Sequence, residues 1–160
     1  MRVARRWLPP ELPVLTTRHA AKRLSRRTTR SAQALDTWER FTTTRGAETL
    51  HVTSVPGRHA PGPLQAALPP EMGSVMELER DGATALRVYV TGDTLCRPVL
   101  RAIPQRLGPI DVMVTHLGGT RVLGLLVTMD AQQGTDLVDM IDAGLVVPNI
   151  KDADSKSMLD

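Results

Sequence analysis

The stretch that decides the fold is Leu86-Arg-Val-Tyr-Val-Thr-Gly-Asp-Thr94, in which an apolar strand runs into Gly92 and delivers Asp93 at its end. A histidine, His59, stands in another turn-rich stretch, Val55-Pro-Gly-Arg-His-Ala-Pro-Gly62. A carboxylate and an imidazole on loops at strand ends suit a hard or borderline metal such as Zn²⁺. Two ligands alone make a weak site, so the question is where further ligands lie.

Before this stretch, the residue pattern predicts strands joined by turns. Residues 49–55 alternate apolar and polar side chains and predict a strand. Residues 73–79 and 85–90 predict a hairpin, because Asp81-Gly82 between them is the strongest turn signal in the chain. The Pro- and Gly-rich segment 56–70 predicts a long ordered loop, and such loops are often functional.

Downstream of this stretch, helices and strands alternate. Residues 95–107 predict an amphipathic helix with Pro98 in its first turn and Pro104 ending or kinking it. Residues 110–115 predict a buried strand, and 145–148 a last short one. Between them, Thr128 or Asp130 is expected to cap a helix to about residue 143 that Gly144 closes.

The N-terminal part predicts a short strand over 13–17 and a helix over 18–24 capped by Thr17, followed by a polar segment, 25–46, that Trp38 anchors. A hairpin followed by alternating strands and helices predicts a layered α/β fold. His59, Asp93 and His116 all follow predicted strands, where α/β folds place their sites.

Composition narrows the class of protein. With 160 residues and 41% hydrophobic residues, the chain predicts one domain over 1–150 with a polar tail over 151–160. The lone cysteine, Cys96, excludes an internal disulfide and fits a reducing compartment. No apolar run is long enough to span a bilayer and no secretory signal is recognisable, so we expect a cytoplasmic protein.

Positive charge is concentrated near the N-terminus, where residues 1–30 carry nine Lys or Arg side chains and one acid, Glu11. Such an arm is typical of nucleic-acid or acidic-membrane binding, or of a solvated helix face. Only Trp7 interleaves with the arginines, so the sequence does not support a base-stacking platform and does not favour nucleic acid as the partner.

Four motifs together resemble those of the metallo-β-lactamase superfamily over roughly residues 2–148. They are Val52-Thr-Ser-Val-Pro-Gly-Arg-His-Ala-Pro-Gly62, Val90-Thr-Gly-Asp-Thr94, Thr115-His-Leu-Gly-Gly-Thr120 and Val127-Thr-Met-Asp-Ala131. The branch they resemble most is that of bacterial metal-dependent hydrolases related to ascorbate-6-phosphate lactonase and N-acyl-phosphatidylethanolamine phospholipase D.

The resemblance implies an αββα sandwich with a dinuclear zinc site, in which the metals activate a water to hydrolyse an ester, lactone or phosphodiester. His59 matches a family metal ligand, and Asp93 matches the catalytic carboxylate that bridges both metals. A plainer reading of Asp93 is a cap on the helix that follows. His116, with Thr94 and Gly92 beside the site, is expected to orient loops rather than bind metal.

Two family features are missing from the sequence. The family's His-x-His-x-Asp-His motif does not occur, and Asn149 follows Val147-Pro148 where the last histidine ligand is expected. We therefore expect a partial sandwich whose first strands are missing, truncated at the N-terminus and diverged at the C-terminus. Such a chain is expected to bind zinc weakly or not at all, to lack ordinary turnover, and to tend to form homo-oligomers.

Three functions remain open. The first is a hydrolase acting on a small-molecule substrate, with Asp93 and His59 as residual ligands. The second is a non-catalytic remnant or binding module, that is, a pseudoenzyme. The third is nucleic-acid binding through the basic N-terminal arm. Cys96 has no paired cysteine or evident base, so we do not expect it to act as a nucleophile.

Overall fold

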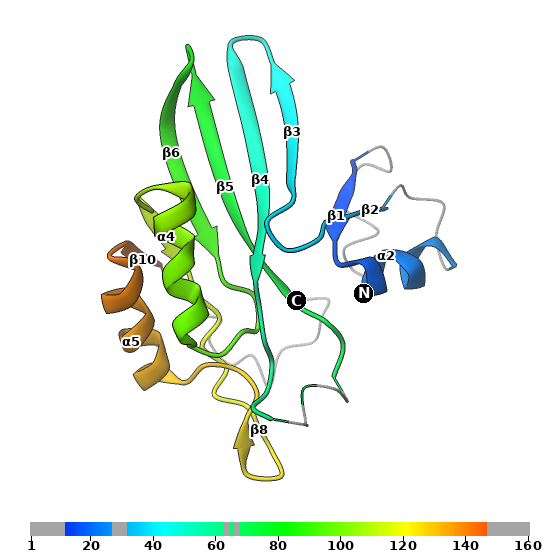
Figure 1. Ribbon diagram of the computed structural model, residues 1–160, viewed down its shortest axis with the longest axis vertical. Helices are drawn as coiled ribbons and strands as arrows, with labels where there is room; N and C mark the ends of the chain where they lie inside the picture. Colours follow the sequence, from blue (N-terminus) through cyan, green and yellow to red (C-terminus); the bar gives the residue numbers. More distant parts are fainter. Residues whose placement is uncertain (1–11, 27–31, 63–64, 66–67, 147–160) are drawn as a thin grey trace, which may run out of the picture.

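A six-stranded mixed sheet forms the centre of the protein, with strand order β10-β7-β6-β5-β4-β3 (Figure 1). The computed structural model describes residues 12–26, 32–62, 65 and 68–146. The strands of this sheet are β3 (Arg40–Arg45), β4 (Glu48–Pro56), β5 (Met72–Arg80), β6 (Ala83–Val90), β7 (Val112–Val114) and β10 (Gly144–Val146). Strands β3 to β6 form an antiparallel meander, whereas β7 and β10 add in parallel beside β6.

The predicted hairpin is confirmed as β5 and β6. Arg80 pairs with Ala83, which leaves Asp81 and Gly82 as a two-residue turn with φ of +53° and +77°. Positive φ at both central residues is the signature of a type I′ turn, for which Asp-Gly is a preferred sequence. The predicted strand over 49–55 is likewise confirmed, as β4.

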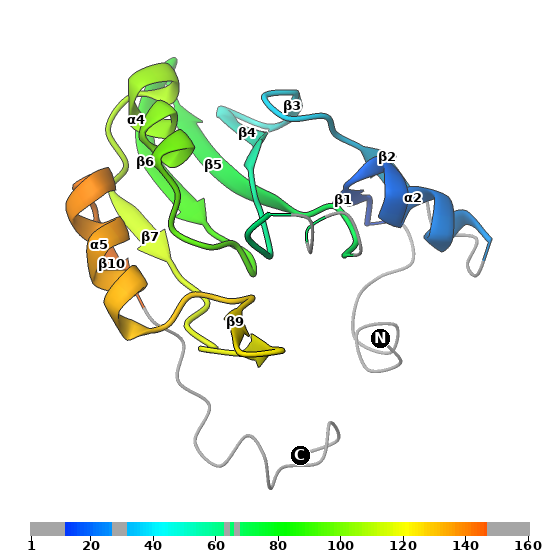
Figure 2. The ribbon, with the colours of Figure 1, turned by 60° about the horizontal axis from the view of Figure 1, so that its bottom comes forward.

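Helices cover one face of the sheet, and Figure 2 shows α4 and α5 together on that side. A 3₁₀ turn, η1 (Pro98–Arg101), leads into α4 (Ala102–Leu107), which runs on through Pro104 instead of ending there. Because Pro104 lies in the first turn of α4, its missing N–H leaves no bond unmade. Pro98 opens η1, as its position in the sequence predicts.

The helix α5 (Ala131–Ile141) begins as expected but ends differently. The side chain of Asp130 caps it by accepting a hydrogen bond from the N–H of Gln133 at 3.0 Å. Its left-handed C-cap is Asp142, with φ of +56°. The prediction that Gly144 closes this helix is therefore wrong; Gly144 opens β10 instead.

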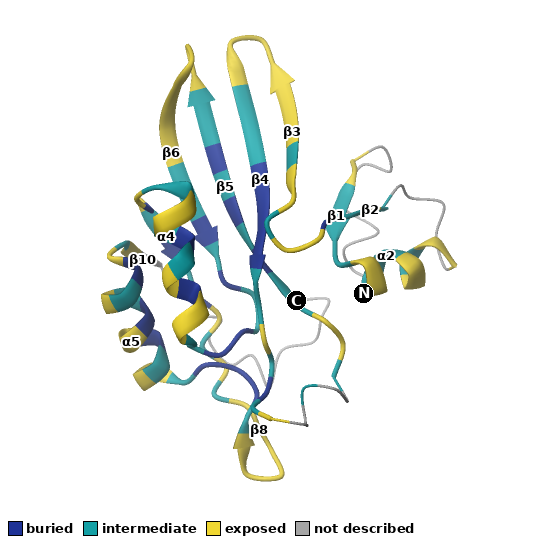
Figure 3. Cartoon of the chain, in the orientation of Figure 1, coloured by how far each residue is buried: buried dark blue, intermediate teal, exposed yellow. Residues whose placement is uncertain are grey.

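The core lies between the helices and the sheet face that they cover. Val55, Val75, Tyr89 and Met113 come from four neighbouring strands and are almost completely buried. They meet apolar side chains of the helical segments, namely Leu100, Ile103, Leu137 and Ile141. Figure 3 shows buried segments of β4, β5 and β6 in dark blue. Burial alternates strictly along the first part of β5, which is why one face of the sheet is core and the other is not.

A smaller unit precedes the sheet and consists of β1 (Val14–Thr16), α2 (Arg18–Ser25) and β2 (Ala32–Ala34), with β1 and β2 parallel. Thr17 caps α2 as predicted, accepting a hydrogen bond from the N–H of Ala20 at 3.3 Å. The basic arm over 1–30 and the polar tail over 151–160 lie partly or wholly outside the described residues. Nucleic-acid binding and the domain boundary at 150 therefore stay predictions.

The polar segment 25–46 holds more regular structure than the sequence predicts. It contains β2 and β3, and β3 was missed because its side chains are almost all exposed and show no alternation. A second missed hairpin joins β8 (Arg121–Val122) to β9 (Leu125–Leu126). Trp38 does pack against the core, as expected, and the guanidinium of Arg106 lies 4.6 Å from its ring centroid. No described helix is long and apolar enough to cross a bilayer.

Candidate metal centre

Three side chains with metal-binding atoms meet at the ends of β4, β5 and β6. His59 follows β4, Glu71 directly precedes β5, and Asp93 follows β6. One ligand atom from each lies within 4.8 Å of the others. The structure thus brings together the two ligands expected from the sequence, His59 and Asp93, and adds a third that was not expected, Glu71.

Backbone pairing explains why His59 and Glu71 meet. Pro56 at the end of β4 pairs with Met72 at the start of β5. The loop between these strands therefore begins and ends at one point of the sheet, and residues just inside its two ends become neighbours. Glu71 carries only a weak sequence signal, an acid at the junction of a Pro-rich loop and a strand, and so it was missed.

Gly92 places Asp93 through its backbone conformation. Its φ is +64°, a region that side-chain-bearing residues rarely adopt. A Cβ at this position would come within 2.8 Å of Glu71 Oε1 and 3.2 Å of the Met72 carbonyl oxygen. Glycine thus lets the chain turn away from β6 while the Glu71 carboxyl lies close against it.

Thr94 ties the two ligand-bearing loops together. Its buried hydroxyl oxygen accepts a hydrogen bond from the N–H of Arg58 at 2.8 Å. The N–H of Leu95 donates to the Arg58 carbonyl oxygen at 2.9 Å. These two bonds hold the loop that carries His59 against the segment that carries Asp93. Asp93 itself does not cap the following helical turn, whose N-cap is Arg97.

One oxygen of the Glu71 carboxyl lacks a hydrogen-bond partner, although the carboxyl also interacts with the backbone of Asp93. That oxygen, Oε2, is buried, and His59 Nδ1 lies 3.3 Å away. Burial, together with the nearby charge of Asp93, raises the pKa of Glu71 to about 7. A divalent cation beside this oxygen would offset both causes, so the donor set of one imidazole and two carboxylates fits a metal such as zinc.

His116 lies at the rim of this group. Its Nδ1 is 3.6 Å from Asp93 Oδ1, and 63% of its side chain is exposed. Its backbone N–H donates to the hydroxyl of Thr91 at 3.3 Å, which fixes the segment after β7 beside the segment after β6. This placement is compatible with the expected orienting role, which stays a prediction.

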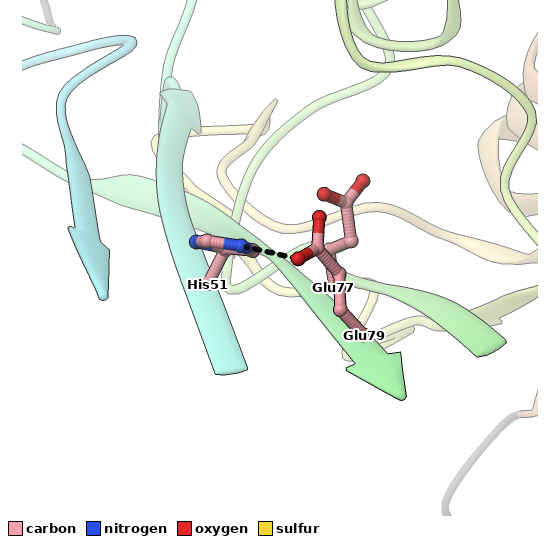
Figure 4. Close-up of side chains that lie close together, drawn as sticks. All are labelled: His51, Glu77 and Glu79. Atoms are coloured by element: carbon pink, nitrogen blue, oxygen red, sulfur yellow. Dashed lines mark ion pairs between the residues drawn. The ribbon is translucent and has the colours of Figure 1, made fainter. Parts of the chain in front are cut away.

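A second group of a histidine and two carboxylates, His51, Glu77 and Glu79, lies on the helix-side face of β4 and β5 (Figure 4). His51 Nε2 is 3.4 Å from Glu79 Oε2. Glu77 is already paired, because Arg87 Nε donates to its Oε2 at 2.5 Å and Arg40 lies 3.8 Å from its Oε1. The arginines neutralise this group, so it is better described as an ion-pair network than as a metal site.

Cys96 shows no sign of a reactive thiol. It is half-buried, and burial is the main cause that raises the pKa of the thiol and keeps it protonated. Its backbone N–H donates to Gln133 Oε1 at 2.9 Å, which joins the segment after β6 to α5. The residue therefore links elements of the fold rather than the reacting groups of a site.

Comparison with solved structures identifies similar folds. A possible metal-dependent hydrolase from Veillonella parvula is 21% identical with a TM-score of 0.66, covering 91% of this chain and 55% of that one. An isothiocyanate hydrolase from Delia radicum gut bacteria is 17% identical with a TM-score of 0.66, covering 92% and 56%. A metallo-β-lactamase fold protein from Bacillus subtilis is 14% identical with a TM-score of 0.51, covering 90% and 55%.

This chain thus spans about half the length of the proteins that it resembles. No curated protein sequence matches it. The family model described as the beta-lactamase superfamily domain matches residues 3–149. The expected family and the expected partial α/β sandwich are therefore confirmed: the chain belongs to the β-lactamase superfamily and has part of the metallo-β-lactamase fold of its metal-dependent hydrolases.

Proposed function

We propose that this chain is the metal-binding part of a hydrolase and that His59, Glu71 and Asp93 together hold one zinc ion. The observation that carries the proposal is the buried Glu71 Oε2 atom, which has no hydrogen-bond partner and lies beside an imidazole and a second carboxylate. A buried polar atom without a partner costs free energy, and coordination to a cation would remove that cost.

The donor set supports a catalytic kind of site. Catalytic zinc ions commonly have three protein ligands and keep a further position open for water or substrate. When bound, the ion would lower the pKa of a water molecule and polarise the bond to be broken in an ester, lactone or phosphodiester. The chain's own contribution is to position the ligands, through the Pro56–Met72 pairing, Gly92 and the Thr94 bond.

We further propose that zinc is held weakly and that turnover by this chain alone is low. The resemblance implies a dinuclear centre with more histidine ligands than His59. The sequence has no His-x-His-x-Asp-His motif, and Asn149 stands where the last histidine ligand is expected. The alternative within the same geometry is a metal-binding module without hydrolytic activity.

Elemental analysis of the chain after equilibrium dialysis against dilute zinc, with the zinc of the buffer subtracted, tests the metal site. We expect zinc at up to about one per chain, in line with a three-ligand site, and its loss in Asp93→Ala. Glu79→Gln is the matched control, because it removes a carboxylate from the second histidine–carboxylate group. Zinc that disappears with Glu79→Gln and persists in Asp93→Ala would place the metal at the wrong group and overturn the proposal.

Hydrolysis assays separate the enzyme from the module. p-Nitrophenyl acetate, a simple γ-lactone and bis(p-nitrophenyl) phosphate represent the three bond classes. A slow, zinc-dependent rate that is lost in Asp93→Ala supports the hydrolase, whereas stoichiometric zinc with no rate on any of the three supports the module. Turnover at ordinary enzyme rates, about 1–1,000 per second, would contradict the proposed weakness of the site.

A further inference from the structure

An open cavity of about 710 Å³, with polar and apolar residues in its lining, lies beside the candidate metal centre. It lies between α2 and the loop that joins β4 to β5. Its polar lining comes from His19, Arg23, Arg58, Gln65 and Glu71. Glu71 belongs to both the cavity and the metal centre, so a molecule in this cavity would lie next to the proposed zinc ion. The volume is in the range of small-molecule sites.

The lining of this cavity is cationic. His19 and Arg23 are four positions apart on α2 and therefore lie on the same face of the helix. Arg58 approaches from the opposite wall, on the loop that Thr94 holds in place. Glu71 is the one acid among the lining residues, and it faces the proposed metal.

Among the described residues, no acid forms an ion pair with the guanidinium group of Arg23 or Arg58. Other arginines of the same region behave differently: Arg18, on the same helix, is paired with Asp36. Arg23 and Arg58 are both exposed, so an anion that enters this open cavity can reach their N–H donors.

A neighbouring cavity, lined mainly by apolar residues, contains a further arginine. It measures about 380 Å³ and shares Gly57 and Arg58 with the first. Arg97 lines it, and the Nε atom of this arginine is buried without a hydrogen-bond partner. Arg58 thus stands between two cavities, each of which holds a further arginine without a carboxylate partner among the described residues. An anion bound at Arg58 would also be attracted by Arg23 in the first cavity and by Arg97 in the second.

We propose that His19, Arg23 and Arg58 form an anion-binding subsite that holds a phosphate or carboxylate group of the substrate next to the metal centre. Arginine binds both groups through paired N–H donors, and the His19 ring adds a further donor. The inference rests on the proposed function for the reaction that follows, but the binding itself requires no metal. The proposed subsite implies that the substrate is a small molecule with a negative charge close to the bond to be broken.

Binding of inorganic phosphate to the full chain, kept metal-free with EDTA, tests the subsite. We expect phosphate to raise the thermal unfolding temperature more than chloride does at equal ionic strength. Arg23→Gln and Arg58→Gln should each weaken phosphate binding about tenfold, the loss expected when one charged hydrogen-bonding group is removed. Lys22→Gln removes the same charge from α2 outside the cavity and should leave binding within about twofold.

A fourth variant and a second anion sharpen the result. Arg58→Lys keeps the charge but loses the paired donors, so it should fall between wild type and Arg58→Gln. Malonate in place of phosphate tells a carboxylate-binding subsite from a phosphate-binding one, and preference for either supports the inference. Equal losses in Lys22→Gln and Arg23→Gln, or no advantage of phosphate and malonate over chloride, would overturn it.

The two proposals fail separately in these experiments. Phosphate binding that depends on Arg23 and Arg58, in a chain that retains no zinc, would leave the subsite standing and remove the metal site. Zinc that depends on Asp93, with no preference for phosphate or malonate over chloride, would do the reverse.

Discussion

At Glu71, burial and a neighbouring charge both oppose ionisation of the side chain. Its carboxyl is largely withdrawn from water, and the charge of Asp93 lies close by, so the neutral form is favoured and the pKa rises from 4.5 to about 7. The folded chain therefore binds a proton more tightly than the unfolded chain does. For a carboxyl shifted in this direction, stability is lost as the pH rises.

The first prediction follows from the raised pKa of Glu71. Between about pH 4.5 and 7, the free energy of unfolding of the metal-free chain should fall because the unfolded state ionises Glu71 first. After allowance for solvent screening, the loss should be roughly 1–2 kcal/mol. Glu71→Gln should remove this part of the pH dependence and make the metal-free chain more stable than wild type at pH 8. Urea unfolding at a series of pH values measures it.

Saturating zinc provides the control for this measurement. A cation that binds the Glu71 carboxylate displaces its proton, so the slope between pH 4.5 and 7 should disappear or reverse with zinc present. If zinc stabilises the chain and leaves that slope unchanged, Glu71 is not a ligand.

Gly92 gives the second prediction at the residue scale. Gly92→Ala should be strongly destabilising, because it forces a Cβ into the left-handed region and to within 2.8 Å of Glu71 Oε1. Gly82→Ala is the matched control: its φ is also positive, +77°, but nothing lies within 4 Å of the added Cβ. The control should cost about 1–2 kcal/mol from backbone strain alone, and Gly92→Ala should cost more.

Zinc affinity distinguishes the two glycine variants further. Gly92→Ala should lower it by displacing Glu71, whereas Gly82→Ala, in the hairpin turn at the far end of β5, should leave it unchanged. The model of a close-packed metal centre fails if both variants lose the same stability and retain the same affinity for zinc.

At the scale of elements, the centre depends on three strand ends held together by loop contacts. The third prediction concerns Thr94, whose hydroxyl accepts a bond from the Arg58 N–H at 2.8 Å. Thr94→Val keeps the side-chain shape and leaves a donor of the His59 loop without this partner. It should cost about 1–3 kcal/mol and weaken zinc binding, since His59 would be less well positioned.

Thr44→Val serves as the control for the loop contact. Thr44 shares a hydroxyl contact of 3.2 Å with Thr49 on the exposed part of β3 and β4, away from the centre. We expect it to change stability by less than about 0.5 kcal/mol and zinc affinity not at all. Calorimetric zinc titration of both variants gives the comparison, and equal affinities in the two would show that the Thr94 bond does not position His59.

At the scale of the whole molecule, the sheet has two unlike faces. The helices η1, α4 and α5 pack on one, while the other presents rows of apolar side chains across neighbouring strands. One such row is Leu50, Leu78 and Leu86, and Leu86 is 39% exposed. Because an apolar sheet face is stable only when another layer covers it, this face favours association.

The fourth prediction is that a second copy of the chain covers this face. Light scattering should show a mass that rises with protein concentration toward that of a dimer. Leu86→Lys should shift the protein toward the monomer by placing a charge on the face. Thr44→Lys adds the same charge to an exposed residue of β3 that pairs with Thr49 on the opposite, helix-side face, and should have little effect. A monomer at every concentration would contradict the prediction.

Much of the fold and part of the site follow from local sequence. The Asp81-Gly82 turn, the alternation in β4 and β5 and the cap at Thr17 all depend on residues close together in the chain, and each was predicted. The edge strand β3 escaped prediction because exposed strands carry no apolar alternation. Asp142, not Gly144, ends α5, because the short polar side chain of aspartate also tolerates the left-handed backbone conformation.

The sequence by itself determined the family, the partial α/β sandwich and the placement of His59 and Asp93 at strand ends, because motifs and periodicity are local properties of the chain. Only the tertiary structure decided that Glu71 joins them, that its carboxyl is buried without a hydrogen-bond partner, and that His19, Arg23 and Arg58 line one cavity. These side chains come from segments far apart in the sequence. Their proximity, and the desolvation that shifts the pKa of Glu71, arise from strand pairing and packing, which no local pattern records.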